Sequence, residues 1–197
     1  MNILKVFEKR FKRKYGFIPY GSEVPAVPEN LNVLDRFGLI PGGYFLFVGR
    51  FIPDKGLHLL VKAFENLKTD KKLVMVGGDP NPGNYESTIK NTKDKRIVFP
   101  GFVYGDDTNI LMKNAFAYVQ PSLIEGLSPV ILTVMGLGTP LVCSDIVENI
   151  FITGENALHF KSGNSDDLKK VLENALENYP VLQQKAALGK VDVKQRF

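Results

Sequence analysis

Short apolar runs alternate with segments of helical periodicity along most of the chain. The runs cover residues 44–48, 72–76, 96–99, 117–120, 140–143 and 157–160, and each has the length and composition of a buried strand. Between the first two runs, apolar residues recur at positions 57, 60, 61, 64 and 67, which is the spacing of a helix with one buried face. The pattern predicts strands and helices in regular succession.

Such a succession is typical of βαβ units, in which right-handed crossovers join parallel strands. We therefore expect an α/β fold with a Rossmann-like parallel sheet of about six strands and helices on both faces. Ligands of such sheets bind in the crevice outside the carboxyl ends of the strands. The residues that directly follow each strand are consequently the candidates for a binding site.

The first 32 residues differ from this pattern. Leu4, Phe7, Phe11 and Tyr15 recur at helical spacing, and 6 lysines and arginines crowd into the first fifteen residues. A stretch rich in glycine and proline follows. We predict a basic amphipathic helix and an extended linker in residues 1–32, and a single globular domain in residues 33–197.

The apolar stripe of this helix has two candidate partners. It packs on the body of the protein, as the stripes of surface helices usually do, or it docks on an anionic membrane surface, for which its basic residues are suited. Nucleic acid is not an expected partner, because no stacking-aromatic motif accompanies the charge.

The composition is ordinary for a soluble globular protein, with 44% hydrophobic and 23% charged residues and a formal net charge of +4. No apolar run has the length of a signal peptide or a membrane span. The single cysteine, Cys143, lies in an apolar run and is expected to be a buried hydrophobic residue rather than a nucleophile. We expect a cytoplasmic protein with at most a peripheral contact to the inner face of the membrane.

Two cations follow the first predicted strand, in a loop that contains Gly49, Arg50 and Lys55. The guanidinium of Arg50 can bind phosphate oxygens with two parallel hydrogen bonds, and Lys55 adds a mobile charge. Together they would bind a diphosphate and stabilise the charge that it develops as a leaving group. A surface loop with two solvated cations is the simpler alternative.

Glycines and a short apolar loop follow the second and third strands. Gly77 and Gly78 permit close approach of the backbone to a ligand, and Phe102 with Val103 forms an apolar segment suited to packing on a nucleobase. A tight turn without a ligand is the alternative. Neither the dinucleotide-binding pattern G-x-G-x-x-G nor the P-loop pattern occurs, which argues against NAD-dependent, FAD-dependent and P-loop enzymes.

The most informative segment follows the fourth strand, where Glu125, Gly126, Leu127 and Ser128 precede a predicted helix over residues 129–137. Ser128 is a favourable N-cap, a proline follows it, and Gly138 is a favourable C-terminal stop. Backbone N–H groups at the start of this helix would hold a phosphate. Glu125 would repel phosphate and is instead suited to accept hydrogen bonds from sugar hydroxyls.

These motifs occur in the same order in family 4 glycosyltransferases of the GT-B fold. Residues 17–197 resemble the C-terminal, donor-binding domain of these enzymes, and the segments 101–105 and 144–149 are most similar to rhamnosyltransferase-like members of group 1. The resemblance implies the C-terminal half of a GT-B fold, with nucleotide-sugar binding in residues 33–197.

The resemblance also implies roles for individual residues. The diphosphate would contact Arg50 and Lys55, and the donor sugar would contact Glu125. The implied catalytic residues are Glu125, Arg50 and Lys55, and the implied substrate-binding residues are Gly49, Gly78, Phe102, Val103, Gly126, Leu127, Ser128 and Thr133.

Two departures from the family pattern are visible. The second glutamate of the family's E-x7-E motif, which usually binds the ribose, is replaced here by Thr133. The family also carries an acceptor-binding domain before the linker, and this chain has none, so we expect it to bind its donor but to be inactive alone. There is no Asp-x-Asp motif and no Cys/His cluster, so no metal site and no cofactor are expected.

The implied function is transfer of a hexose from a nucleotide-diphosphate sugar to a glycan or a lipid-linked acceptor. Two alternatives remain open at the level of sequence. One is a non-catalytic nucleotide-binding or interaction module with this fold, and the other is a GT-B-like epimerase that acts on the nucleotide sugar itself.

Overall fold

The computed structural model describes residues 2–16, 18–21, 23–81 and 83–197, and it describes no side chain before residue 5. Leu4 of the predicted apolar stripe, Phe17 and Ser22 of the linker and Pro82 of the second loop therefore lie outside the described side chains. In the described part of the chain, the strands are β1 (Tyr44–Arg50), β2 (Lys72–Gly78), β3 (Ile97–Gly101), β4 (Ala117–Gln120), β5 (Leu141–Ser144) and β6 (Leu158–Phe160).

These strands form one parallel sheet in the order β3-β2-β1-β4-β5-β6, so the six-stranded Rossmann-like sheet is confirmed. Strands β1 and β2 extend two residues beyond their predicted ends. Gly49 and Arg50 consequently belong to β1 and pair in register with Gly77 and Gly78 of β2, rather than lying in a free loop.

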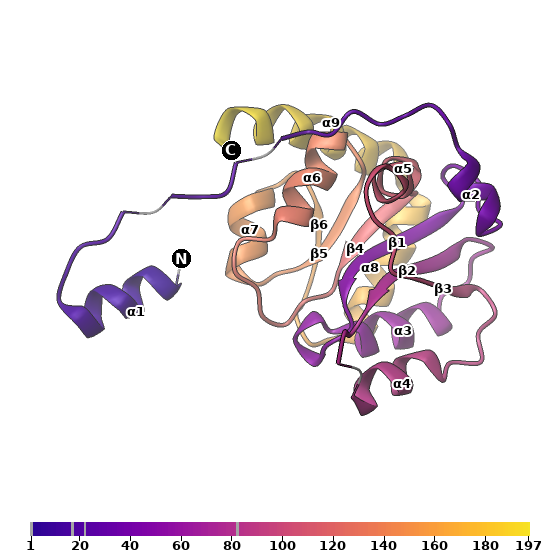
Figure 1. Ribbon diagram of the computed structural model, residues 1–197, viewed down its shortest axis with the longest axis horizontal. Coiled ribbons are helices and arrows are strands. Elements are labelled where there is room, and N and C mark those ends of the chain that lie inside the picture. The colour runs from indigo at the N-terminus through magenta and orange to yellow at the C-terminus, as the bar shows by residue number, and fades with distance from the viewer. Residues whose placement is uncertain (1, 17, 22, 82) are drawn as a thin grey trace.

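Helices connect the strands and cover both faces of the sheet (Figure 1). The helices of the described residues are α1 (Asn2–Phe11), which does not contact the sheet, followed by α2 (Asn32–Arg36), the 3-10 turn η1 (Pro53–Lys55), α3 (Leu57–Glu65), α4 (Asn84–Lys90), α5 (Asp106–Asn114), α6 (Pro129–Leu137), α7 (Val147–Thr153), α8 (Ser165–Glu177) and α9 (Tyr179–Arg196).

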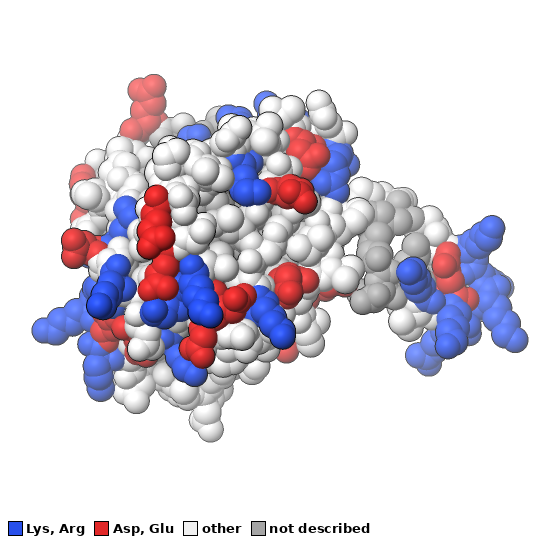
Figure 2. Space-filling view, turned by 180° about the vertical axis from the view of Figure 1, so that it is seen from behind, with Lys and Arg blue, Asp and Glu red and all other residues white. Residues whose placement is uncertain are grey.

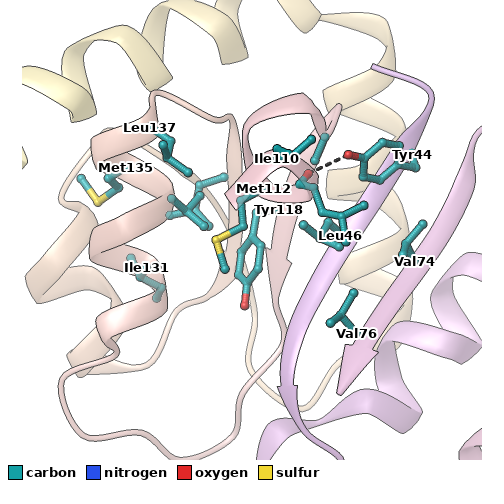
Figure 3. Packing of buried hydrophobic residues seen from close by; sticks show 14 of the residues in the cluster. Tyr44, Leu46, Val74, Val76, Ile110, Met112, Tyr118, Ile131, Met135 and Leu137 are labelled. Carbon is teal, nitrogen blue, oxygen red and sulfur yellow. Dashed lines mark hydrogen bonds between the residues drawn. The ribbon is translucent and has the colours of Figure 1, made fainter. Parts of the chain in front are cut away.

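Alternate side chains of the central strands face two separate cores, because successive residues of a strand point to opposite faces. Tyr44 and Leu46 pack with residues of α2, α5, α6 and α7, whereas Phe45 and Phe47 pack with residues of α3, α4 and α8. On the first face, the hydroxyl of Tyr44 donates to the carbonyl oxygen of Leu111 at 2.7 Å, which satisfies the polar end of a buried ring (Figure 3). The sheet is therefore covered on both sides, as its continuous apolar strands predict.

Helix α6 has the predicted bounds. Its N-cap position is Ser128 and its C-cap is Gly138 with φ +71°, a left-handed conformation that glycine adopts without strain. The side chain of Ser128, however, makes no capping hydrogen bond, so the prediction of its position is confirmed and that of its side-chain bond is wrong. Pro129 has no N–H and the N–H of Leu132 binds the carbonyl oxygen of Ser128, so Val130 and Ile131 carry the N–H groups that another acceptor could bind.

Helix α1 stands apart from the sheet and its helices (Figure 1), with its lysines and arginines around it (Figure 2). Phe7 is 48% and Phe11 is 51% exposed, and the ring of Phe7 contacts the rings of Phe11 and Tyr15. The expectation that this stripe packs on the body of the described domain is wrong, because an extended segment separates the helix from that body. None of the described helices is both long and apolar enough to cross a membrane.

Candidate functional site

The carboxyl ends of β1 and β4 lie side by side at the point where the strand order reverses. Strand β1 has β2 on one side and β4 on the other. In open α/β sheets the ligand crevice opens at this switch point. The loops that follow β1 and β4 are therefore the walls of the candidate site.

These two loops are packed tightly against each other. The backbone N–H of Leu123 donates to the carbonyl oxygen of Asp54 at 2.8 Å. Gly56 has φ +65°, and a Cβ atom at this position would lie 2.1 Å from the carbonyl oxygen of Pro121. Only glycine allows the loop after β1 to approach the loop after β4 so closely.

The close approach brings Lys55 and Glu125 into contact. The Nζ atom of Lys55 lies 2.6 Å from Oε1 of Glu125, and the two side chains are 19% and 8% exposed. A carboxylate with so little solvent access requires hydrogen-bond donors. The pairing was not predicted, because the sequence analysis assigned Lys55 to the diphosphate and Glu125 to the sugar.

Two further donors reach the same carboxylate oxygen. The Nε2 atom of Gln120 and the hydroxyl of Ser122 donate to Oε1 of Glu125 at 2.6 and 2.7 Å. Neither residue was predicted from the sequence, where Gln120 is only the polar last residue of the fourth strand. A buried polar residue at the carboxyl end of a strand in such a sheet is the signal that identifies them.

Arg50 lies at the exposed end of β1. It pairs in register with Gly78, whose carbonyl oxygen accepts from the backbone N–H of Phe51 at 3.1 Å. A Cβ atom on Gly78 would lie 3.2 Å from the ring of Phe102. Gly49, Arg50, Gly78 and Phe102 are thus brought together at this edge of the sheet.

The loop after β3 places two aromatic rings beside this edge. Phe102 and Tyr104 are parallel to within 4°, with ring centroids 6.0 Å apart, and both are exposed. Val103 turns inward, packs against the core on the α6 side and has its carbonyl oxygen bound by the hydroxyl of Thr108 at 2.7 Å. The loop therefore presents aromatic surface on a fixed backbone.

The buried carboxylate of Glu86, on α4, supports the turn after β2. Its Oε2 atom accepts from the backbone N–H of Asp79 at 2.8 Å. The hydrogen bond from Lys90 lowers the pKa of Glu86, against the opposing effect of desolvation. This contact, which was not predicted from the sequence, fixes the backbone directly after Gly78, the residue that lies beside Phe102.

The start of α6 completes the edge. Gly126 is exposed, Leu127 packs partly against the core, and Ser128 is buried. Thr133 lies one turn further, where its hydroxyl donates to the carbonyl oxygen of Pro129 at 3.2 Å. Open N–H groups at a helix start attract an anion, so phosphate is the ligand that this end of α6 suits.

Each histidine contacts a hydroxyl group. His58 contacts the hydroxyl of Tyr85 at 2.9 Å, and Nε2 of His159 lies 2.8 Å from the hydroxyl of Thr153. Desolvation lowers the pKa of both imidazoles. Cys143 is fully buried, and burial raises the pKa of its thiol to about 12, as expected for a core residue. Within the described residues, no group of three or more His, Cys, Asp or Glu side chains could hold a metal ion.

Comparison with known proteins identifies the family. The family described as "Glycosyl transferases group 1" matches residues 42–178. O-antigen chain mannosyltransferase B of Escherichia coli is 26% identical over 87% of this chain and 47% of its own length. O-antigen chain mannosyltransferase C of the same organism is 29% identical over 73% of this chain and 42% of its own length. The chain thus spans about half the length of these relatives.

Solved structures show the same fold. Sucrose-phosphate synthase from Thermosynechococcus elongatus superposes on 98% of this chain and 52% of its own with a TM-score of 0.83 at 21% identity. Anabaena HepE in complex with UDP-glucose superposes on 84% of this chain and 48% of its own with a TM-score of 0.76 at 20% identity. The family match, the relatives and the parallel six-stranded sheet agree: this chain belongs to the group 1 glycosyltransferases and has the Rossmann-like architecture of their GT-B fold.

Proposed function

We propose that this chain is the donor-binding half of a glycosyltransferase that moves a hexose from a nucleotide-diphosphate sugar to a glycan or a lipid-linked acceptor. The observation that carries the proposal is the convergence of Lys55 and Glu125, a cation and a carboxylate, at the switch point of the sheet. A diphosphate requires the first charge, and sugar hydroxyls suit the second. Relatives named for mannose transfer and a neighbour in complex with UDP-glucose support this class of donor.

In this proposal the diphosphate lies between Arg50, Lys55 and the start of α6. The two cations and the helix end stabilise the negative charge that grows on the nucleoside diphosphate as the glycosidic bond to it breaks. These groups carry that charge without a metal ion, so we propose metal-independent binding. Glu125 accepts hydrogen bonds from the sugar, and the exposed ring of Phe102 lines the side on which the base lies, on a loop that Val103 anchors to the core.

The acceptor would bind to a second half of the enzyme. Because the chain spans about half of its relatives, we propose that an acceptor-binding domain completes the site and that the chain alone binds donor without transferring sugar. We further propose that this domain covers the aromatic stripe of α1, formed by Phe7, Phe11 and Tyr15. In a protein with both halves, Phe11→Asp should lower the Tm, whereas in this chain it should leave the Tm unchanged, because the ring is exposed.

The basic face of α1 suits an anionic surface. Lys5, Lys9, Lys12 and Lys14 lie on or just after this helix with two arginines, and Glu8 is the only acidic residue among the first fifteen. We propose that this face gives the enzyme a peripheral contact with anionic lipid headgroups, where a lipid-linked acceptor would also be found.

Calorimetric titration tests the donor proposal. Wild type should bind one of UDP, GDP or dTDP, bind the corresponding nucleotide sugar, and do so with and without magnesium. Arg50→Ala should weaken binding about tenfold or more, since a hydrogen-bonded charge is lost, while Lys68→Ala, an exposed lysine elsewhere, should not. Failure of wild type to bind any of these nucleotides, or identical curves for Arg50→Ala, would contradict the proposal. Conversion of a nucleotide sugar without an acceptor would instead reveal an epimerase.

A further inference from the structure

Gln120 is a buried amide at the carboxyl end of β4. It is 2% exposed, and it lies in a strand whose four residues are all buried. A side-chain amide is retained in such a place only where hydrogen bonds satisfy both of its ends. The partners of Gln120 therefore indicate what the residue does.

The hydrogen bonds determine the orientation of the amide. An ionised carboxylate only accepts, so the Nε2 end of Gln120 must face Glu125, whose Oε1 lies at 2.6 Å. The Oε1 end of Gln120 then faces the hydroxyl of Tyr118 at 3.0 Å. When it donates to Gln120, that hydroxyl accepts in turn from the backbone N–H of Val48 at 3.4 Å. A chain of hydrogen bonds thus connects the backbone of β1, through Tyr118 and Gln120, to the carboxylate of Glu125.

Three donors converge on one oxygen of Glu125. Lys55, Gln120 and Ser122 all bind Oε1, at 2.6, 2.6 and 2.7 Å. Oε1 has no capacity for another donor, so Oε2 is the oxygen that can accept a hydrogen bond from a ligand.

The three donors differ in how firmly the fold holds them beside Glu125. The ammonium group of Lys55 lies at the end of a flexible side chain. An incoming diphosphate would compete with Glu125 for this ammonium group. Gln120 and Ser122 are buried and attached to β4 and its first loop residues. When Lys55 turns towards phosphate, these two residues remain to hold the carboxylate.

From this geometry we propose that Gln120 is a positioning residue for Glu125: it holds Oε1 so that Oε2 faces the sugar of the donor. The proposal rests on the proposed function for the sugar, but the contact between Gln120 and Glu125 can be tested without any ligand. The tests therefore separate a failure of the positioning role from a failure of the donor site.

The first test is the pH dependence of stability. In Q120E a second carboxyl faces Glu125, so the folded pair retains a shared proton that the unfolded chain releases at a lower pH. Because the folded state binds the extra proton, stability is present at low pH and is lost as the pH rises. Between pH 5 and 8, we expect the Tm of Q120E to fall relative to wild type by roughly 5 °C, whereas the deficit of the matched variant Q120L stays constant.

An exchange variant provides the control for this contact. Q120E/E125Q restores one amide facing one carboxylate, with the two groups interchanged, and should abolish the extra pH dependence. A Q120E curve parallel to that of wild type at every pH would overturn the contact between Gln120 and Glu125.

The second test measures affinity for UDP and UDP-glucose, and for GDP and GDP-mannose, at pH 7.5. We expect Q120L and Q120E to bind the nucleotide sugar preferred by wild type about tenfold more weakly, while affinity for the bare nucleotide changes less than twofold. The exchange variant should keep this defect, because its carboxylate no longer stands at position 125. Equal losses for nucleotide and nucleotide sugar would reduce Gln120 to a structural role and overturn the proposal. If wild type itself binds none of the four probes, the donor proposal fails, and the Tm profiles still decide whether Gln120 holds Glu125.

Discussion

The ammonium of Lys55 and the carboxylate of Glu125, 70 residues apart in the chain, lie 2.6 Å from each other at the carboxyl edge of the sheet. They meet because β1 and β4 are neighbours and the loops after these strands interlock at Gly56. The cation proposed for the diphosphate is thus paired with the carboxylate proposed for the sugar. Donor binding would replace this ion pair by contacts to the two parts of one ligand.

Glu125→Gln should separate the two roles. The substitution keeps the shape of the side chain but removes the charge that holds Lys55, so the cation is free for phosphate. We expect UDP to bind as tightly as to wild type or more tightly, and the nucleotide sugar to lose roughly 1–2 kcal/mol of binding free energy. Calorimetry measures both, with Glu177→Gln on the exposed face of α8 as the matched control. Parallel losses for both ligands would show that Glu125 does not distinguish sugar from nucleotide.

Thr133→Glu should strengthen nucleotide binding. By the family resemblance, a second carboxylate at this place in α6 binds the ribose, and Thr133 offers one hydroxyl instead. Two added hydrogen-bond acceptors for the ribose hydroxyls should improve the affinity for the bound nucleotide about three- to tenfold. Thr88→Glu, on the exposed face of α4, is the control in the same titration. Unchanged or weaker binding would place the ribose elsewhere.

Gly77→Ala should strongly destabilise the fold. Gly77 has φ +120°, and a Cβ atom there would lie 2.0 Å from the carbonyl oxygen of Gly49 on the neighbouring strand. The strained backbone and the clash together should lower the free energy of unfolding by about 3 kcal/mol or more, measured by urea denaturation. Gly83→Ala, where nothing lies within 4 Å of the added atom, should change it by less than about 1 kcal/mol.

Mild acidification should destabilise the protein through His159. Burial lowers the pKa of this imidazole below its ordinary value of about 6.5, so near that pH the unfolded chain binds more protons than the folded protein. The stability is complete above about pH 6.5 and declines as the pH falls towards the folded-state pKa. In thermal melts between pH 7.5 and 5, His159→Gln should show a smaller decline than wild type, and an identical decline would assign the effect to other groups such as His58.

Anionic lipid should bind the chain through α1. Each lysine or arginine near an anionic bilayer contributes about 1 kcal/mol, so the charge reversal Lys9→Glu/Arg13→Glu should greatly reduce co-sedimentation with vesicles containing phosphatidylglycerol. Vesicles of phosphatidylcholine alone should bind neither protein. Lys62→Glu/Lys68→Glu, which makes the same charge change on the domain, is the control. Equal binding of both double variants would remove the proposed peripheral contact.

Much of the local structure follows from the sequence alone. The pattern of apolar residues predicts all six strands of the sheet and helix α6 with its bounds. It does so because the spacing of apolar residues follows from which face of a strand or helix is buried. Gly138 and Pro129 mark the ends of α6 because their backbone preferences are intrinsic to the residue. The order of the motifs along the chain was likewise sufficient to recognise the family.

Only the tertiary structure decided which of these motifs meet. Strand order depends on how the crossover helices pack, which no local pattern encodes, and that order places β1 beside β4 and hence Lys55 against Glu125. The same order brings Gln120, the last residue of β4, close enough to Glu125 to donate a hydrogen bond to its carboxylate. The exposed stripe of α1 is the opposite case: its amphipathic sequence requires a partner, but periodicity is a property of one helix and does not identify the surface that covers it.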